Sequence, residues 1–100
     1  MDEACSKSGL TIRLTEERWL HITEGHPELA GCYFEVLETV SDPDAVYEGN
    51  YGAMIAKKKM DGKHLVMIYK EIGTTDGFVI TAFLTKKPET IERRRRIWPA

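Results

Sequence analysis

The chain has 100 residues, a net charge of −2, two cysteines and 42% apolar side chains. This length suits one domain with one core, and two cysteines without a Cys-x-x-Cys spacing exclude a disulfide framework and argue against a zinc or redox site. No apolar run approaches the roughly 20 residues that span a bilayer, and residues 1–4 lack the features of a secretory signal, so we expect a cytoplasmic protein without a membrane segment.

Charge is segregated along the sequence. Residues 1–50 carry 3 basic and 11 acidic side chains, whereas residues 51–100 carry 11 basic and 5 acidic ones. A basic half can focus an electric field on an anionic partner even when the whole chain is nearly neutral. The same pattern also fits a solvated surface whose segregation does not survive folding.

The first half of the chain favours helices. Residues 1–9 have the composition of a flexible lead, and we expect the domain to span residues 10–100, beginning with a short strand over 10–14. Thr15 is a good N-cap for a helix over residues 16–24, which Gly25 and Pro27 would end. An apolar stripe at helical spacing predicts a second helix over residues 28–40.

The second half favours strands. Extended structure is expected over residues 45–48, followed by strands over 51–59 and 64–71 that the turn Asp61-Gly62 would join. The most apolar strand is 77–85, and Pro88 suits the first turn of a short helix over 89–94. The sequence therefore predicts an α+β domain, with two N-terminal helices packed on one face of an antiparallel sheet of about four strands and a short C-terminal helix.

The two hairpins sort side chains onto the two faces of this sheet. The Asp61-Gly62 loop, and a second hairpin that pairs Glu71 with Phe78, predict these cross-strand neighbours: Lys59–His64, Lys57–Val66, Ile55–Ile68, Ala53–Lys70, Ile68–Thr81, His64–Thr85 and Lys70–Val79. The face under the helices is then apolar and consists of Met54, Ala56, Leu65, Met67, Tyr69, Ile80, Ala82 and Leu84.

The face away from the helices has the parts of an anion-binding floor. It is expected to carry Tyr51, Lys57, Lys59, His64, Lys70, Thr81 and Thr85. Lysines neutralise phosphate and aromatic rings stack on bases. Lys70, flanked by apolar residues, would bind an anion more strongly than a solvated lysine. The alternatives are that its stem only covers apolar surface and that the threonines are only good strand formers.

His21 and His26 are the candidate proton carriers, because histidine titrates nearest neutrality. Their spacing of five does not place both on one face of a helix, and each also fits a structural or surface histidine. No third ligand stands at a recognisable spacing, so we expect no metal and no cofactor. Arg93 opens a run of four arginines that would either grip an RNA backbone or form a solvated terminal helix.

Several short stretches, in order, carry a resemblance to a known family. They are residues 19–29 with His21 and His26-Pro27, Asp42-Pro43-Asp44, residues 65–70, residues 77–85, and Ile97-Trp98. Together they resemble the phage-associated branch of the barnase, EndoU, colicin and RelE-like (BECR) nuclease superfamily over roughly residues 15–98. The resemblance implies two N-terminal helices, a four-stranded antiparallel sheet and RNA cleavage without a metal.

The resemblance also implies roles for single residues. His21 and His26 would handle protons, Lys70 would stabilise the charge of the phosphorane, and Thr81 and Thr85 would bind phosphate or orient the substrate. Tyr51, Lys57, Lys59, His64 and Arg93 would then contact the RNA. Because the helices cover the other face of the sheet, a histidine has to reach round an edge to meet Lys70, and His26 at the helix exit is better placed to do so.

Three functions compete at this stage. The first is a small metal-independent endoribonuclease, toxin-like or of phage origin, that uses the ribose 2′-hydroxyl as nucleophile. Its partners would be RNA and a neutralising protein. The second is a catalytically inactive RNA- or protein-binding domain of the same fold. The third is a structural or regulatory domain whose acidic half contacts a basic partner.

Overall fold

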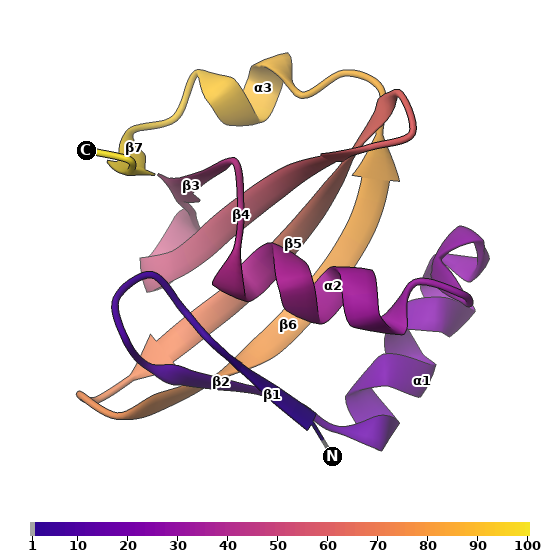
Figure 1. The fold of residues 1–100 in the computed structure, drawn as a ribbon, viewed down its shortest axis with the longest axis horizontal. Helices are drawn as coiled ribbons and strands as arrows, with labels where there is room; N and C mark the ends of the chain where they lie inside the picture. The colour runs from indigo at the N-terminus through magenta and orange to yellow at the C-terminus, as the bar shows by residue number, and fades with distance from the viewer. Residues whose placement is uncertain (1) are drawn as a thin grey trace.

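The computed structural model describes residues 2–100, which form a seven-stranded sheet flanked by helices (Figure 1). In the order in which they lie side by side, the strands are β1 (Asp2–Cys5), β2 (Thr11–Leu14), β6 (Asp76–Thr85), β5 (Lys63–Ile72), β4 (Ala53–Met60), β3 (Ala45–Glu48) and β7 (Arg96–Trp98). The helices are α1 (Glu16–Gly25), α2 (Tyr33–Ser41) and α3 (Glu89–Glu92), with short 3₁₀ turns η1 (Pro27–Leu29) and η2 (Asn50–Gly52).

The α+β class is confirmed, but the expected sheet of about four antiparallel strands is wrong in two respects. The sheet has seven strands, and β2 runs parallel to β6 while the other neighbours are antiparallel. The additional strands β1 and β7 are four and three residues long, too short to show a periodic signal in the sequence. Strand direction is likewise not encoded in periodicity, because it depends on the long connection through α1 and α2.

Residues 2–5, which the sequence assigned to a flexible lead, form β1 and pair with β2. Two side-chain hydrogen bonds attach this N-terminal segment to the rest of the fold. The buried Ser6 hydroxyl donates to Glu71 Oε2 at 2.8 Å, and the Tyr33 hydroxyl donates to Asp2 Oδ2 at 2.8 Å. Within the lead that was expected to be flexible, residues 2–5 are therefore an edge strand. Met1 lies outside the described residues.

The β4–β5 hairpin follows the predicted register along its whole length. Lys59 pairs with His64, and Ala53 pairs with Lys70. The turn residues Asp61 and Gly62 both have positive φ, 51° and 77°, which is the conformation that a two-residue Asp-Gly turn requires. The turn chemistry alone therefore fixed which side chains share a face on these two strands.

The β5–β6 hairpin departs from the predicted register at one bulge. His64–Thr85 and Ile68–Thr81 pair as expected, but Tyr69 then pairs with Val79, so the extra residue lies in β6. Beyond the bulge Lys70 lies opposite Phe78 and not Val79. Val79 consequently packs in the core under the helices, the position that the sequence assigned to Ile80.

The main core lies between the sheet and the two N-terminal helices. Ile22 of α1 and Val36 and Val40 of α2 pack against buried residues of the sheet, which include Ala56, Leu65, Met67, Tyr69, Val79 and Ala82. Helix α2 lies across β4 and β5 (Figure 1). Thr15 caps α1 as predicted, with its hydroxyl accepting from the Arg18 N–H at 3.1 Å. No helix within residues 2–100 is long and apolar enough to cross a membrane.

The sheet face away from α1 and α2, called the outer face below, is partly covered and not bare as the sequence predicted. Ile91 of α3 packs against a second apolar cluster on this face, formed by Ala45, Tyr47, Ile55 and Val66 with Ile68 and Phe83. Lys57 lies beneath α3, is 7% exposed, and its Nζ is 3.1 Å from Glu92 Oε2. A helix of four residues carries no periodicity that would have revealed this cover.

Candidate functional site

His26 reaches the outer face round the free edge of β6. Strand β2 pairs only with residues 76–78 of β6, and within the described chain no strand pairs with the rest of that edge. Helix α1 ends beside it, where His26 leaves the helix with φ −135° and ψ 72°. The imidazole lies 6.1 Å from the ring of Phe83, centroid to centroid, and 3.6 Å from Glu28 Oε2.

A row of three polar side chains lies next to this contact. The register places Lys59, His64 and Thr85 directly opposite one another on β4, β5 and β6, so their Cβ atoms are about 4.5–5.5 Å apart from strand to strand. His64 is also a diagonal neighbour of Phe83, at about 7–8 Å. Phe83 therefore contacts the ring of His26 and is a diagonal neighbour of His64 on the outer face.

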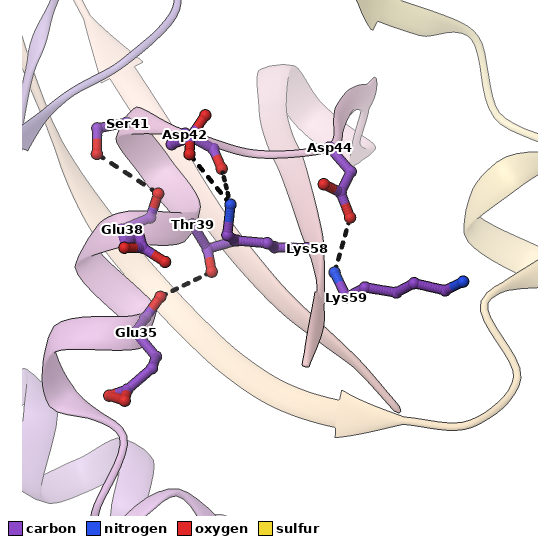
Figure 2. Close-up of polar contacts among 8 residues, drawn as sticks. All are labelled: Glu35, Glu38, Thr39, Ser41, Asp42, Asp44, Lys58 and Lys59. Atoms are coloured by element: carbon purple, nitrogen blue, oxygen red, sulfur yellow. Dashed lines mark hydrogen bonds and ion pairs between the residues drawn. The ribbon is translucent and has the colours of Figure 1, made fainter. Parts of the chain in front are cut away.

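The atoms of this row differ in their availability. His64 Nδ1 is sealed from solvent and has no hydrogen-bond partner within residues 2–100, so Nε2 is the ring nitrogen left for a substrate. Lys59 is exposed, and its backbone N–H donates to Asp44 Oδ2 at 2.7 Å while the side chain extends away from that carboxylate (Figure 2). The Thr85 hydroxyl accepts from the Lys87 N–H at 3.0 Å and keeps its own proton to donate.

The group formed by His26, Lys59, His64, Phe83 and Thr85 is called the histidine site below. Thr81 is half-buried two positions along β6 from Phe83, on the same face. Sequence reasoning named four of these five side chains as site residues but assigned His64 to substrate contact only. It expected His26 to reach round a sheet edge toward Lys70, whereas the structure brings His26 to Phe83, at the His64 end of the outer face.

Lys70 lies at the other end of the outer face. It is six residues from His64 on the same strand, roughly 20 Å at about 3.4 Å per residue. Its neighbours are Ala53 and the partly exposed Phe78, with the Arg13–Asp76 ion pair on the adjoining strands. The structure therefore separates Lys70 from His26 and His64. The resemblance implied a different arrangement, with His21 or His26 acting on the same phosphate as Lys70.

The remaining predicted site residues are dispersed. His21 is exposed on the outward side of α1, beside Glu17 and Glu24, and among residues 2–100 it forms no hydrogen bond or ion pair. Tyr51 is 95% exposed in η2 with φ 53°, and Arg93 is exposed at the end of α3. Lys57 is covered by α3 as described above, so it is not part of an open floor.

The arginine run serves mainly to fix the C-terminal segment. Arg94 donates to the side-chain oxygen of Asn50 at 3.2 Å, and Arg95 binds Glu48 Oε2 with its Nη2 at 2.7 Å. Both contacts join the segment around β7 to the end of β3. This leaves Arg93 and Arg96 as the members of the run without such contacts in the described part of the chain.

Across residues 2–100 no group of three or more His, Cys, Asp or Glu side chains is arranged to hold a metal ion. Searches of protein-family models, of curated proteins and of solved structures found no match to this chain.

Proposed function

We propose that the protein is a small endoribonuclease that cleaves RNA without a metal ion, with the histidine site as its active site. The observation that carries this proposal is that His26 and His64 both lie near Phe83, in a patch that also holds an exposed lysine and a hydroxyl. His26 lies just past the end of α1, and one ring nitrogen of His64 has no hydrogen-bond partner within residues 2–100.

The chemistry needs three kinds of group, and the patch supplies them. One imidazole removes the proton from the ribose 2′-hydroxyl, whose oxygen attacks phosphorus, and the other donates a proton to the departing 5′-oxygen. The bond from phosphorus to that oxygen breaks, leaving a 2′,3′-cyclic phosphate. Lys59 offsets the charge that develops on the phosphorane oxygens, and the Thr85 hydroxyl donates to one of them.

The surrounding surface supports binding of a single strand. The ring of Phe83, next to His26, offers a stacking surface. At the other end of the outer face, Lys70 and Phe78 combine a cation with a partly exposed aromatic ring. We assign Lys70 to a phosphate a few nucleotides away from the scissile one, because it is too far from the imidazoles to share their phosphate.

The test is cleavage of a fluorescently labelled single-stranded RNA in excess chelator, with the new ends identified by mass spectrometry. We expect cyclic phosphate ends, a bell-shaped pH profile of kcat/KM, and a loss of about 10²- to 10⁴-fold in His26→Gln and His64→Gln. His21→Gln is the matched control, since His21 is exposed on the outward side of α1, and it should keep full activity. Full activity in both site variants, or loss of activity in chelator, would reject the mechanism.

A second function has one observation in its favour. The Lys70 end of the outer face, with Phe78 and Arg13, has the character of a binding surface but holds no histidine. A catalytically inactive domain that binds RNA, or a neutralising protein, through this surface would show salt-dependent RNA binding without turnover. In that case His64→Gln would leave RNA affinity unchanged while Lys70→Gln would lower it.

A further inference from the structure

A hollow lies on the helix side of the sheet, between the β1–β2 turn and β7. It has a volume of about 210 Å³, and its walls include Lys7, Val46, Met54, Tyr69 and Trp98. Val46 and Tyr69 belong to the main core under the helices. The hollow is therefore on the opposite face from the histidine site, and this inference is independent of the proposed nuclease activity.

The inner wall carries a hydrogen-bonding group without a partner. Tyr69 is 1% exposed, and its hydroxyl forms no hydrogen bond within residues 2–100. Buried tyrosine hydroxyls ordinarily find a partner. Among residues 2–100, the only side-chain polar atom that is both unpartnered and sealed from solvent is His64 Nδ1, so the unpartnered Tyr69 hydroxyl is not sealed. The Tyr69 hydroxyl therefore remains in contact with the hollow, which it lines.

This phenol is held in its neutral form. Burial, with a smaller contribution from the negative charge of Glu71, raises the pKa of Tyr69 above its ordinary value. A neutral hydroxyl both donates and accepts one hydrogen bond, so it matches a hydroxyl or carbonyl oxygen on a bound molecule.

The mouth of the hollow carries a cation over an aromatic ring. Lys7 Nζ lies 4.5 Å from the centroid of the Trp98 ring. Among residues 2–100, Lys7 forms no ion pair, so its charge is free to meet an anion. Trp98 pairs with Val46 in the sheet and packs against the core, which holds its ring as a rigid wall.

We propose that this hollow binds a small planar aromatic anion that carries a second hydrogen-bonding oxygen. The ring lies against Trp98 and Met54, the far oxygen meets the Tyr69 hydroxyl, and the anionic group lies at the mouth beside Lys7. Small-molecule sites place a few convergent polar groups beside apolar side chains, and this hollow combines the Tyr69 hydroxyl and Lys7 with Val46, Met54 and Trp98 in the same way. The volume admits one or two fused rings.

The probe is 4-hydroxybenzoate, titrated into the ¹⁵N-labelled full chain and followed at the indole N–H resonances by NMR. Trp19→Phe identifies the Trp98 signal. We expect a saturable shift of that signal with a Kd on the order of 1 mM, as suits a ligand of this size. Benzoate, which lacks the far oxygen, and 4-hydroxybenzamide, which lacks the charge, should each bind roughly three- to tenfold more weakly.

Two variants match the two halves of the probe. In Tyr69→Phe, 4-hydroxybenzoate and benzoate should bind equally well, and in Lys7→Gln, 4-hydroxybenzoate and 4-hydroxybenzamide should do so. Lys86→Gln, an exposed lysine outside the hollow, is the control for unspecific attraction of anions. The proposal would be overturned by a Trp98 signal that does not saturate, or by ligand affinities that neither Tyr69→Phe nor Lys7→Gln changes. Unchanged binding in His64→Gln would show that the hollow acts separately from the histidine site.

Discussion

The ion pair between Lys57 and Glu92 attaches α3 to the outer face, and replacing its carboxylate tests how much that attachment contributes. Lys57 is 7% exposed and lies beneath the helix, whereas the Glu92 side chain is 42% exposed. In Glu92→Gln the lysine would keep its charge in the same buried place without an opposite charge. The expected result is a loss of stability, because an uncompensated buried charge is costly.

The size of the loss follows from the geometry. At 3.1 Å between Lys57 Nζ and Glu92 Oε2, Coulomb's law with an effective dielectric constant of 20 gives an attraction of about 5 kcal/mol. Water reaches the exposed side of Glu92 and screens much of this attraction, and the neutral amide retains a hydrogen bond. We therefore expect the free energy of unfolding to fall by about 1–2 kcal/mol, which lowers Tm by roughly 4–16 °C in a domain of this size.

The assay is thermal and urea unfolding of a double-mutant cycle. Lys57→Met removes the buried charge and should stay within about 1 kcal/mol of the parent, because an apolar residue of similar volume replaces a desolvated ion. Adding Glu92→Gln to Lys57→Met should then cost less than about 0.5 kcal/mol. Glu89→Gln is the matched control on the same helix, since Glu89 forms no ion pair in the described chain. An equal loss with and without Lys57 would refute the reasoning.

Two further predictions concern stability. An added Cβ at Gly77 would overlap the backbone of β5, so Gly77→Ala should lower the free energy of unfolding by roughly 3 kcal/mol in urea unfolding. Gly25 has open space around it, so the control Gly25→Ala should be neutral or up to about 1 kcal/mol stabilising. Burial and, secondarily, Glu71 raise the pKa of Tyr69 in the folded state. Above about pH 10 the unfolded chain then binds fewer protons than the native one, and stability falls by up to about 1.4 kcal/mol per pH unit. Tyr69→Phe should make this alkaline decline shallower and Tyr51→Phe, at a 95% exposed position, should not; equal slopes in pH-dependent urea unfolding would contradict the burial argument.

The sequence determined the β4–β5 hairpin correctly because its information is local. Asp61-Gly62 admits one turn geometry, and the turn sets the pairing of Lys59 with His64 and all pairs beyond it. The two helices and most of the apolar face beneath them were also accessible, because a stripe at helical spacing can bury itself only against an apolar surface. The details differ, since the second helix begins at Tyr33 and not at residue 28, and Val79 takes the core position expected for Ile80. These parts of the fold depend on neighbours in sequence.

The parts that sequence reasoning missed depend on contacts between distant segments. The bulge in β6 places Phe78 beside Lys70, and no local pattern announces it. The cover of α3 over Lys57 rests on one apolar and one acidic side chain of a four-residue helix. Similarly, the contact of His26 with Phe83 depends on where α1 ends and on the free edge of β6. The positions of the histidines in the sequence predict neither of these.

The single bulge in β6 acts as a parity switch for that strand. On its C-terminal side odd-numbered residues such as Thr81 and Thr85 face outward, and on its N-terminal side the even-numbered Phe78 does so. Deleting Ile80 should remove the bulge, so that side chains alternate between the two faces along the whole of β6. We expect little change in the surrounding structure, because a strand without a bulge is straighter. A variant without Ile80 would keep the β5–β6 pairs on both sides of the bulge and would change only the local twist of the strand. The bulge is therefore the position at which this sheet can most easily gain or lose one residue.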